Sequence, residues 1–281
     1  VRGRKDLENL SIPFIGEIPQ YLSAKKKLGF DKHTQSVMKA IVVKEGNRNI
    51  INEAFRVLRS NIDFMAGKDS GQNVFMLTSF NPGSGKSFLA MNIAMSFAIK
   101  KKRILVIDGD LRHGSTSSYV DSPKTGLSDY LGNRVSDWKE IIVKDEKYDN
   151  LHIIPIGTVP PNPTELLEDG KLATLIEVLR SEYDYIFIDC PPIDIVADAQ
   201  IIEKLADRTV FVVRSGLLDR SMLPELENIY QEKRFKNLSV ILNGTESAGG
   251  RYGYRYGYRN GYSSYYGNKG KMGGGKWVVI K

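Results

Sequence analysis

Residues 81–87 read Asn-Pro-Gly-Ser-Gly-Lys-Ser and lie between the apolar run Val74–Thr78 and the helical stretch Ser87–Lys100. Two further apolar runs end in carboxylates: Ile104–Ile107 precedes Asp-Gly-Asp-Leu-Arg at 108–112, and Tyr185–Ile188 precedes Asp-Cys-Pro-Pro at 189–192. Continuous apolar runs of this kind are typical of strands buried on both faces, as in a parallel sheet covered by helices. The apolar runs therefore predict an α/β fold. The three polar segments that follow them predict a ligand site at the carboxyl ends of its strands.

The stretch at 81–87 has the composition of a phosphate-binding loop. Gly83 and Gly85 permit the backbone angles that let amides point inward around phosphates. Lys86 would reach the β- and γ-phosphates, Ser87 would place its hydroxyl on Mg²⁺, and the following helix would offer its first amides. The usual pattern begins with a glycine where this chain has Phe80, and an ordinary glycine loop is the alternative. The predicted cofactor-binding residues here are Gly83, Ser84, Gly85, Lys86, Ser87 and Phe88.

A glycine-rich tail without acidic residues closes the sequence. From Ser247 to Lys281 it carries seven bases, and the other 33 of the 40 Lys and Arg balance the 33 Asp and Glu, so the tail holds the entire net charge of +7. It lacks core-forming periodicity and is expected to be disordered. The apolar Trp277–Ile280 at its end has no role that the sequence explains. Seven tyrosines crowd the tail: Tyr252, Tyr254, Tyr256, Tyr258, Tyr262, Tyr265 and Tyr266.

A site for a γ-phosphate and a row of phenols on one chain together predict ATP- and Mg²⁺-dependent protein-tyrosine autophosphorylation. Side chains two apart at a strand end point the same way, so Asp108 and Asp110 can face one site. One could accept the proton of a phenol, whose ordinary pKa is near 10, while the other holds a metal-bound water. Asp189 would hold the metal or its water. The predicted catalytic residues are Lys86, Asp108, Asp110 and Asp189, and the predicted metal ligands are Ser87, Asp108, Asp110 and Asp189.

Other readings remain open at this point. Asp108 and Asp110 could be solvated carboxylates in a turn, and Asp189 could cap a helix. A switching ATPase could use the tyrosines as adhesive contacts without transferring phosphate to them. A basic aromatic tail could also bind single-stranded nucleic acid. The neutral body offers no matching basic groove, so no nucleic-acid partner is expected.

The remaining pattern divides the chain into an N-terminal segment (1–45), a P-loop NTPase domain (46–246) and the tail (247–281). The mostly parallel sheet should be flanked by helices. Ile51, Phe55, Leu58, Ile62 and Met65 recur at helical spacing, which predicts an amphipathic helix over 50–66. Further predicted strands are Leu151–Ile156, Thr209–Val213 and Ser239–Leu242; further predicted helices are Thr164–Arg180, Ile195–Leu205 and Pro224–Lys233.

No run of about 18 apolar residues occurs, and a single cysteine suggests a reducing compartment.

These motifs together resemble the bacterial tyrosine kinases of capsule and exopolysaccharide synthesis. Their pattern is a phosphate loop, a strand ending Asp-x-Asp-x-Arg, a strand ending Asp-x-x-Pro and a C-terminal tyrosine cluster, and it covers roughly residues 10–266. The resemblance implies nucleotide contacts for Arg112 and, near the adenine, for Asn243. Partition and cell-division ATPases of similar fold carry a lysine where this chain has Asn81, which argues against that branch.

The resemblance also implies partners and a location. It gives Glu53, Arg56 and Arg59 a role in a ring of subunits, suggested to be an octamer, in which tails enter neighbouring sites; by spacing alone these residues read as a solvated helix face. It implies a domain at the cytoplasmic face of the inner membrane, fused to or paired with a polysaccharide co-polymerase that controls chain length and export. Ile12–Pro19 looks like the stretch after that protein's second membrane span. A cognate tyrosine phosphatase is a further implied partner.

Overall fold

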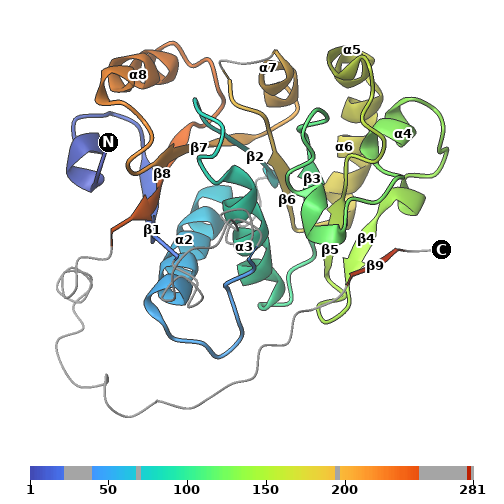
Figure 1. Cartoon of the computed structure of the whole chain (residues 1–281), viewed down its shortest axis with the longest axis horizontal. Coiled ribbons are helices and arrows are strands. Elements are labelled where there is room, and N and C mark those ends of the chain that lie inside the picture. Colours follow the sequence, from blue (N-terminus) through green and yellow to red (C-terminus); the bar gives the residue numbers. More distant parts are fainter. Residues whose placement is uncertain (22–39, 68–70, 194–196, 247–276, 280–281) are drawn as a thin grey trace, which may run out of the picture.

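The computed structural model describes residues 1–21, 40–67, 71–193, 197–246 and 277–279. In this part of the chain a single sheet has the strand order β1-β8-β7-β2-β6-β3-β5-β4-β9 (Figure 1). All neighbours are parallel except β4, which is antiparallel to both β5 and β9. The strands are β1 Phe14–Pro19, β2 Val74–Thr78, β3 Ile104–Asp108, β4 Val143–Asp145, β5 Leu151–Ile154, β6 Tyr185–Asp189, β7 Arg208–Arg214, β8 Ser239–Thr245 and β9 Trp277–Val279.

Helices cover both faces of the sheet. They are α2 Ile50–Ala66, α3 Lys86–Ala98, α4 Leu127–Leu131, α5 Pro163–Glu168, α6 Lys171–Glu182, α7 Asp198–Glu203 and α8 Leu223–Gln231. Short 3-10 turns lie at η1 Arg4–Leu7, η3 Ser117–Val120, η4 Trp138–Ile141 and η5 Arg220–Met222. The predicted P-loop α/β architecture is thereby confirmed, and the predicted helix over 50–66 coincides with α2.

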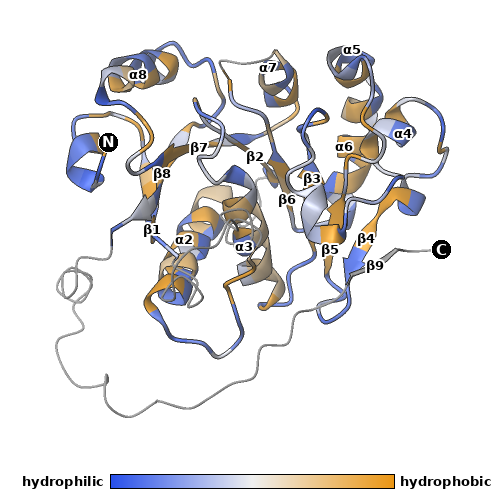
Figure 2. Ribbon diagram, in the orientation of Figure 1, coloured by the Kyte–Doolittle hydropathy of each residue, from blue (hydrophilic) through white to orange (hydrophobic). Residues whose placement is uncertain are grey.

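The central strands β2, β3 and β6 are buried at every position, because helices cover both faces of the sheet there. In β2, Phe75 and Leu77 belong to the core beneath α2 and α3, whereas Val74 and Met76 belong to the core on the opposite face. This alternation follows from the two-residue period of a strand. Figure 2 shows the apolar residues gathered on the strands and on the helix faces that meet them.

Helix α3 is buried around almost its whole circumference, because the sheet lies on one side and α2 on the other. Its residues from Leu89 to Ala98 are all buried. A helix in this position needs small and apolar residues on every face rather than an amphipathic stripe. Helix α2 covers it from outside, with Phe55, Leu58 and Ile62 fully buried. The phosphate loop therefore opens into a helix that is fixed on all sides.

The structure changes three expectations. The predicted helix Thr164–Arg180 is two helices, because Gly170 takes the left-handed conformation (φ +82°) and separates α5 from α6. The folded unit extends back before residue 46, since β1 pairs with β8 and buries Ile15 and Ile18. Disorder is the wrong expectation at 277–279, where β9 pairs with the edge strand β4. An edge strand offers unpaired main-chain groups, and Trp and Val favour extended pairing.

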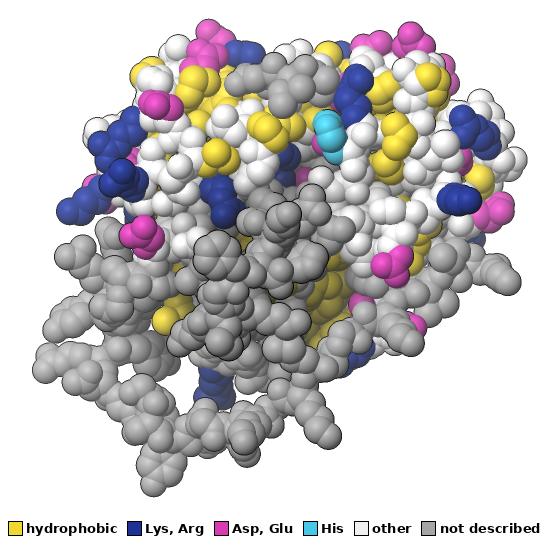
Figure 3. Space-filling view, in the orientation of Figure 1, with side chains coloured by type: hydrophobic (Ala, Val, Ile, Leu, Met, Phe, Trp, Pro, Cys, Tyr) yellow, Lys and Arg dark blue, Asp and Glu magenta, His cyan; other side chains and the backbone are white. Residues whose placement is uncertain are grey.

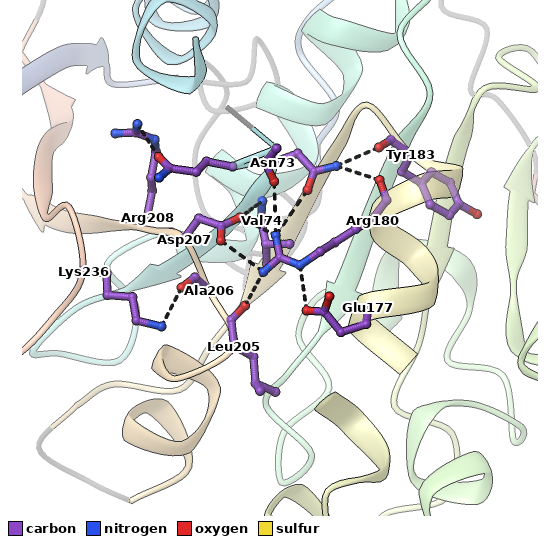
Figure 4. A network of polar contacts seen from close by, with 12 residues as sticks. Asn73, Val74, Glu177, Arg180, Tyr183, Leu205, Ala206, Asp207, Arg208 and Lys236 are labelled. Carbon is purple, nitrogen blue, oxygen red and sulfur yellow. Dashed lines mark hydrogen bonds and ion pairs between the residues drawn. The ribbon is translucent and has the colours of Figure 1, made fainter. Parts of the chain in front are cut away.

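A polar network fixes the amino ends of the central strands (Figure 4). Arg180 of α6 donates to Asp207 at 2.6 Å, and Asp207 also accepts from the amide of Val74 at 2.9 Å. The Asn73 side chain donates to the carbonyls of Arg180 and Tyr183 at 3.0 and 2.9 Å. The network joins α6 to the starts of β2 and β7 at the end of the sheet opposite the phosphate loop.

Candidate active site

The phosphate loop joins β2 to α3 at the carboxyl edge of the sheet. Gly83 and Gly85 take left-handed angles, with φ of +74° and +92°. A Cβ atom on Gly85 would lie 2.2 Å from the side-chain nitrogen of Asn243, so this position has no room for a side chain. The Asn243 amide donates to the carbonyl of Ser84 at 2.9 Å. Asn243, at the end of β8, thus holds the loop backbone, and its implied contact with adenine stays a prediction.

Lys86 is the first residue of α3, and its side chain reaches back to Ser79, just after β2. Its ammonium group donates to the hydroxyl of Ser79 at 3.1 Å, and the residue is only 9% exposed. Burial lowers the pKa of Lys86, whereas the nearby carboxylates of Asp189 and Asp110 raise it. Its hydrogen-bond partner is a neutral hydroxyl, so the cation stays available for an anionic ligand in the loop.

The two strand-end aspartates face the loop from neighbouring strands. Asp108 of β3 and Asp189 of β6 are register partners, with 0% and 2% of their surface exposed. One oxygen of Asp108 accepts from the amide and the hydroxyl of Ser117, each at 2.6 Å. One oxygen of Asp189 accepts from Thr116 at 2.7 Å and from Ser87. Each carboxylate is therefore held by one oxygen.

The second oxygen of each carboxylate is buried and has no hydrogen-bond partner among the described residues. Burial, together with the charge of Asp189, raises the pKa of Asp108 to about 8, and burial likewise raises the pKa of Asp189. Unpaired buried carboxylates are costly unless a cation compensates them. Mg²⁺ prefers such oxygen donors and commonly takes one or two carboxylates, with phosphates and waters completing its shell. These residues fit Mg²⁺ bound together with a nucleotide.

Within the described residues no group of three or more Asp, Glu, His or Cys side chains forms a closed cation cage. One oxygen of Asp110 accepts from the amides of Arg112 and His113 at 3.3 and 3.2 Å. The same oxygen lies 3.2 Å from the His113 ring nitrogen. Asp110 thus caps its own turn in this structure, and its role as a metal ligand stays a prediction.

The side chain of Arg112 contacts helices α5 and α7, and its implied contact with the nucleotide stays a prediction. Its Nε lies 3.2 Å from Asp198 of α7, and its Nη2 donates to the hydroxyl of Thr164 in α5 at 2.9 Å. The motif alone did not reveal these partners, which lie 86 and 52 residues further along the chain.

Sequence reasoning also missed Thr116 and Ser117. They belong to a Ser-Thr-Ser-Ser run at 115–118 that follows the Asp108 motif closely. A run of hydroxyls shortly after a buried carboxylate is the signal that could have indicated them, since hydroxyls are suited to hold one oxygen of an acid.

The predicted assembly residues lie on the outer side of α2. Glu53 and Arg56 form an ion pair with each other, and Arg59 donates to the carbonyl of Ser96 in α3 at 2.8 Å. Burial and the neighbouring Arg56 lower the pKa of Arg59. A pocket of about 190 Å³ beside them is lined by Lys44, Glu45, Arg56, Arg59, Ser96 and Lys100, among others.

Side chains of both charges are interspersed on the described part of the face in Figure 3. The seven tail tyrosines lie outside the described residues.

Known proteins share both the sequence and this arrangement. A family model described as an AAA domain matches residues 72–234. The putative tyrosine-protein kinase CapB of Staphylococcus aureus is 32% identical over 74% of this chain and 91% of its own length. A putative tyrosine-protein kinase in the cps region of Klebsiella pneumoniae is 34% identical over 86% of this chain, which spans only 33% of that protein.

Among solved structures, the kinase domain of the Escherichia coli tyrosine kinase ETK superposes with a TM-score of 0.75 at 27% identity. The match covers 95% of this chain and 100% of that domain. The phosphate loop, the paired strand-end aspartates and these similarities agree with one another, and the chain belongs to the bacterial tyrosine kinases of capsule and exopolysaccharide synthesis.

Proposed function

We propose that this tyrosine kinase uses MgATP to phosphorylate the tyrosines of its own C-terminal tail, within an assembly of several copies. The observation that carries the proposal is the buried pair Asp108 and Asp189, each with one unpartnered oxygen, beside Ser87 and Lys86. Bound Mg²⁺ would neutralise charge on the phosphates. Ser87, Asp108 and Asp189 are the residues that would hold it, and Asp110 is a further candidate.

The protein's own groups would perform the transfer. The amides of the phosphate loop and Lys86 would bind and orient the phosphates. A tail phenol oxygen forms the new bond to the γ-phosphorus, the bond from that phosphorus to the bridging oxygen breaks, and ADP leaves. Asp108 or Asp110 would take the phenol proton. The two aspartates could exchange the roles of base and metal ligand.

The position of β8 supports the tail as substrate. β8 is parallel to β7 and ends at Thr245, so the chain leaves the sheet from the edge that carries Asp108 and Asp189. Tyr252 to Tyr266 lie nine to 23 residues beyond Asn243. A flexible segment of that length wanders roughly 15–28 Å, which reaches both its own site and a neighbour's. We favour transfer between neighbours in a ring.

The α2 surface supports such a ring. Arg56 and Arg59 line a pocket together with Lys44, Lys100 and Glu45. Its four cations outnumber its one carboxylate, so an acidic group from a second copy would suit it. We further propose a location at the cytoplasmic face of the inner membrane, with an inner-membrane co-polymerase fused upstream or paired, and control of polysaccharide chain length and export. The Klebsiella relative, three times longer than the matched region, is compatible with fusion.

Phosphorylation would then act as the assembly switch. Each phosphate adds about −1.5 to −2 charges, so a fully modified tail changes from +7 to a net negative charge. A product of inverted charge should leave an acidic site, and a ring held by inserted tails should loosen. A cognate phosphatase would reset it.

Intact-mass spectrometry of the full chain tests the proposal. Incubation with MgATP should add a ladder of phosphate masses that map to Tyr252–Tyr266, and Lys86→Met should abolish the ladder. Asp108→Asn should abolish it while ATP binding remains measurable. Measurable ATP binding in the unmodified protein with no added mass would overturn autophosphorylation.

A further inference from the structure

A buried carboxylate outside the motifs joins three segments of the site. Asp198, the first residue of α7, is 0% exposed. Its Oδ2 lies 3.2 Å from Nε of Arg112, and its Oδ1 accepts from the Thr164 hydroxyl at 2.7 Å. Nη2 of Arg112 also donates to that hydroxyl at 2.9 Å. The three side chains form a closed triangle, here called the Arg112 clamp.

The clamp ends on the aspartate loop. The backbone amide of Arg112 donates to Asp110 at 3.3 Å, so one residue holds Asp110 through its main chain and Asp198 through its side chain. Thr164 lies in the first turn of α5, and α7 follows the segment that begins at Asp189. The clamp thus links the loop after β3 to α5 and α7.

The charge arrangement makes the clamp rigid. The side chain of Asp198 is fully buried, whereas that of Arg112 is 36% exposed. Removing the partner of a buried charge is strongly destabilising, because the remaining charge is left without compensation. The guanidinium of Arg112 donates from a rigid plane, so the two acceptors restrict its orientation more narrowly than they would restrict an ammonium group.

We infer that Asp198 and Thr164 are positioning residues for Mg²⁺-dependent nucleotide binding, acting through Arg112 on the Asp110 loop. The inference rests on the proposed function, in which Asp110 is a candidate Mg²⁺ ligand or base. Residues that hydrogen-bond a metal-ligating side chain and so orient it commonly contribute about 10- to 100-fold to metal affinity, which is lost when they are removed. A clamp that served stability alone would leave the Mg²⁺ dependence unchanged.

The test compares variants of the Arg112 clamp, at the carboxyl end of the sheet, with a control variant at the amino end, all in the full-length chain. Asp198→Asn removes the buried charge, Thr164→Val removes the hydroxyl, and Thr164→Ser keeps it. Asp207→Asn is the matched control, because it weakens a carboxylate–guanidinium pair with Arg180 at the opposite end. For each variant, ADP affinity is measured by calorimetry with Mg²⁺ and with EDTA, alongside the melting temperature. The ratio of the two affinities reports the Mg²⁺ effect separately from activity.

Asp198→Asn and Thr164→Val should reduce that ratio about tenfold or more, while ADP affinity in EDTA stays within about twofold. Thr164→Ser should keep the ratio, and Asp207→Asn should lower the melting temperature only. Should Asp198→Asn prove too unstable to purify, Thr164→Val against Thr164→Ser carries the test, because neither changes a charge.

Asp110→Asn separates the inference from the function on which it rests. A reduced ratio in Asp110→Asn with an unchanged ratio in Asp198→Asn and Thr164→Val would overturn the clamp and leave the proposed site intact. An unchanged ratio in Asp110→Asn would overturn the role proposed for Asp110, and the inference with it.

Discussion

Asp108 and Asp189 are direct register partners at the carboxyl ends of the adjacent strands β3 and β6, although they are 81 residues apart in the chain. Each is anchored through one oxygen by hydroxyl donors, and each leaves the other oxygen buried and unpartnered within the described structure. The pairing places two buried carboxylates side by side, with the charge of Lys86 acting on Asp189.

Ser117→Ala should impair the kinase while Ser118→Ala should not. The Ser117 hydroxyl donates to Asp108 at 2.6 Å and accepts from the amide of Ile156 at 2.8 Å. Its loss removes one of the two donors to Asp108, since the amide of residue 117 remains, and it leaves the buried amide of Ile156 unsatisfied, at a cost of about 1–3 kcal/mol. The Ser118 hydroxyl donates instead to the carbonyl of Ser115, in a hydrogen bond at the exposed surface. Rates of tail phosphorylation and melting temperatures measure both effects, and equal behaviour of the two variants would contradict the positioning of Asp108.

Raising the pH should remove the stability that protonated Asp108 contributes to the metal-free protein. The pKa of Asp108 is about 8 in the folded chain and near 3.8 in the unfolded one, so between these values the folded state binds more protons. The contribution of Asp108 to the free energy of unfolding therefore falls as pH rises from about 4 to 8. Asp108→Asn should flatten this dependence. Calorimetry in EDTA across that range checks it, and a parallel pH profile in the variant would count against the raised pKa.

Gly85→Ala should abolish nucleotide binding. The new methyl group would meet the Asn243 side chain at 2.2 Å and would require a left-handed φ of +92°. Gly83→Ala also needs a positive φ but meets nothing within 4 Å, so its loss of affinity should be smaller. Gly85→Ala combined with Asn243→Ala should recover part of the binding if the clash contributes. Calorimetric titration with ATP measures all three, and equal affinities for Gly83→Ala and Gly85→Ala would contradict the close approach.

Removal of residues 277–281 should expose the edge of β4. In the folded chain β9 pairs with Val143, Lys144 and Asp145. Truncation leaves their outward main-chain groups to water, so hydrogen exchange in 143–145 should accelerate. Peptides from β1, at the opposite edge of the sheet, serve as the internal control. If exchange in 143–145 is the same in both chains, β9 does not protect β4 in solution.

The sequence by itself determined the positions of most central strands, of helix α2 and of the phosphate loop. Continuous apolar runs placed β2, β3, β6, β7 and β8 within a few residues, helical periodicity placed α2, and the glycines at 83 and 85 indicated the phosphate loop. Each of these signals depends on neighbours in sequence, where strand and helix periods and the freedom of glycine act directly.

Only the tertiary structure decided which polar groups meet. The sequence predicted carboxylates at strand ends, but the alignment of Asp108 with Asp189, and the turn of Arg112 towards Asp198 and Thr164, depend on contacts between distant segments. The pairing of β1 and β9 with the sheet was likewise hidden, because six and three residues carry too little local pattern. A buried group takes whichever partner satisfies it, and that partner is fixed by strand order and register rather than by spacing along the chain.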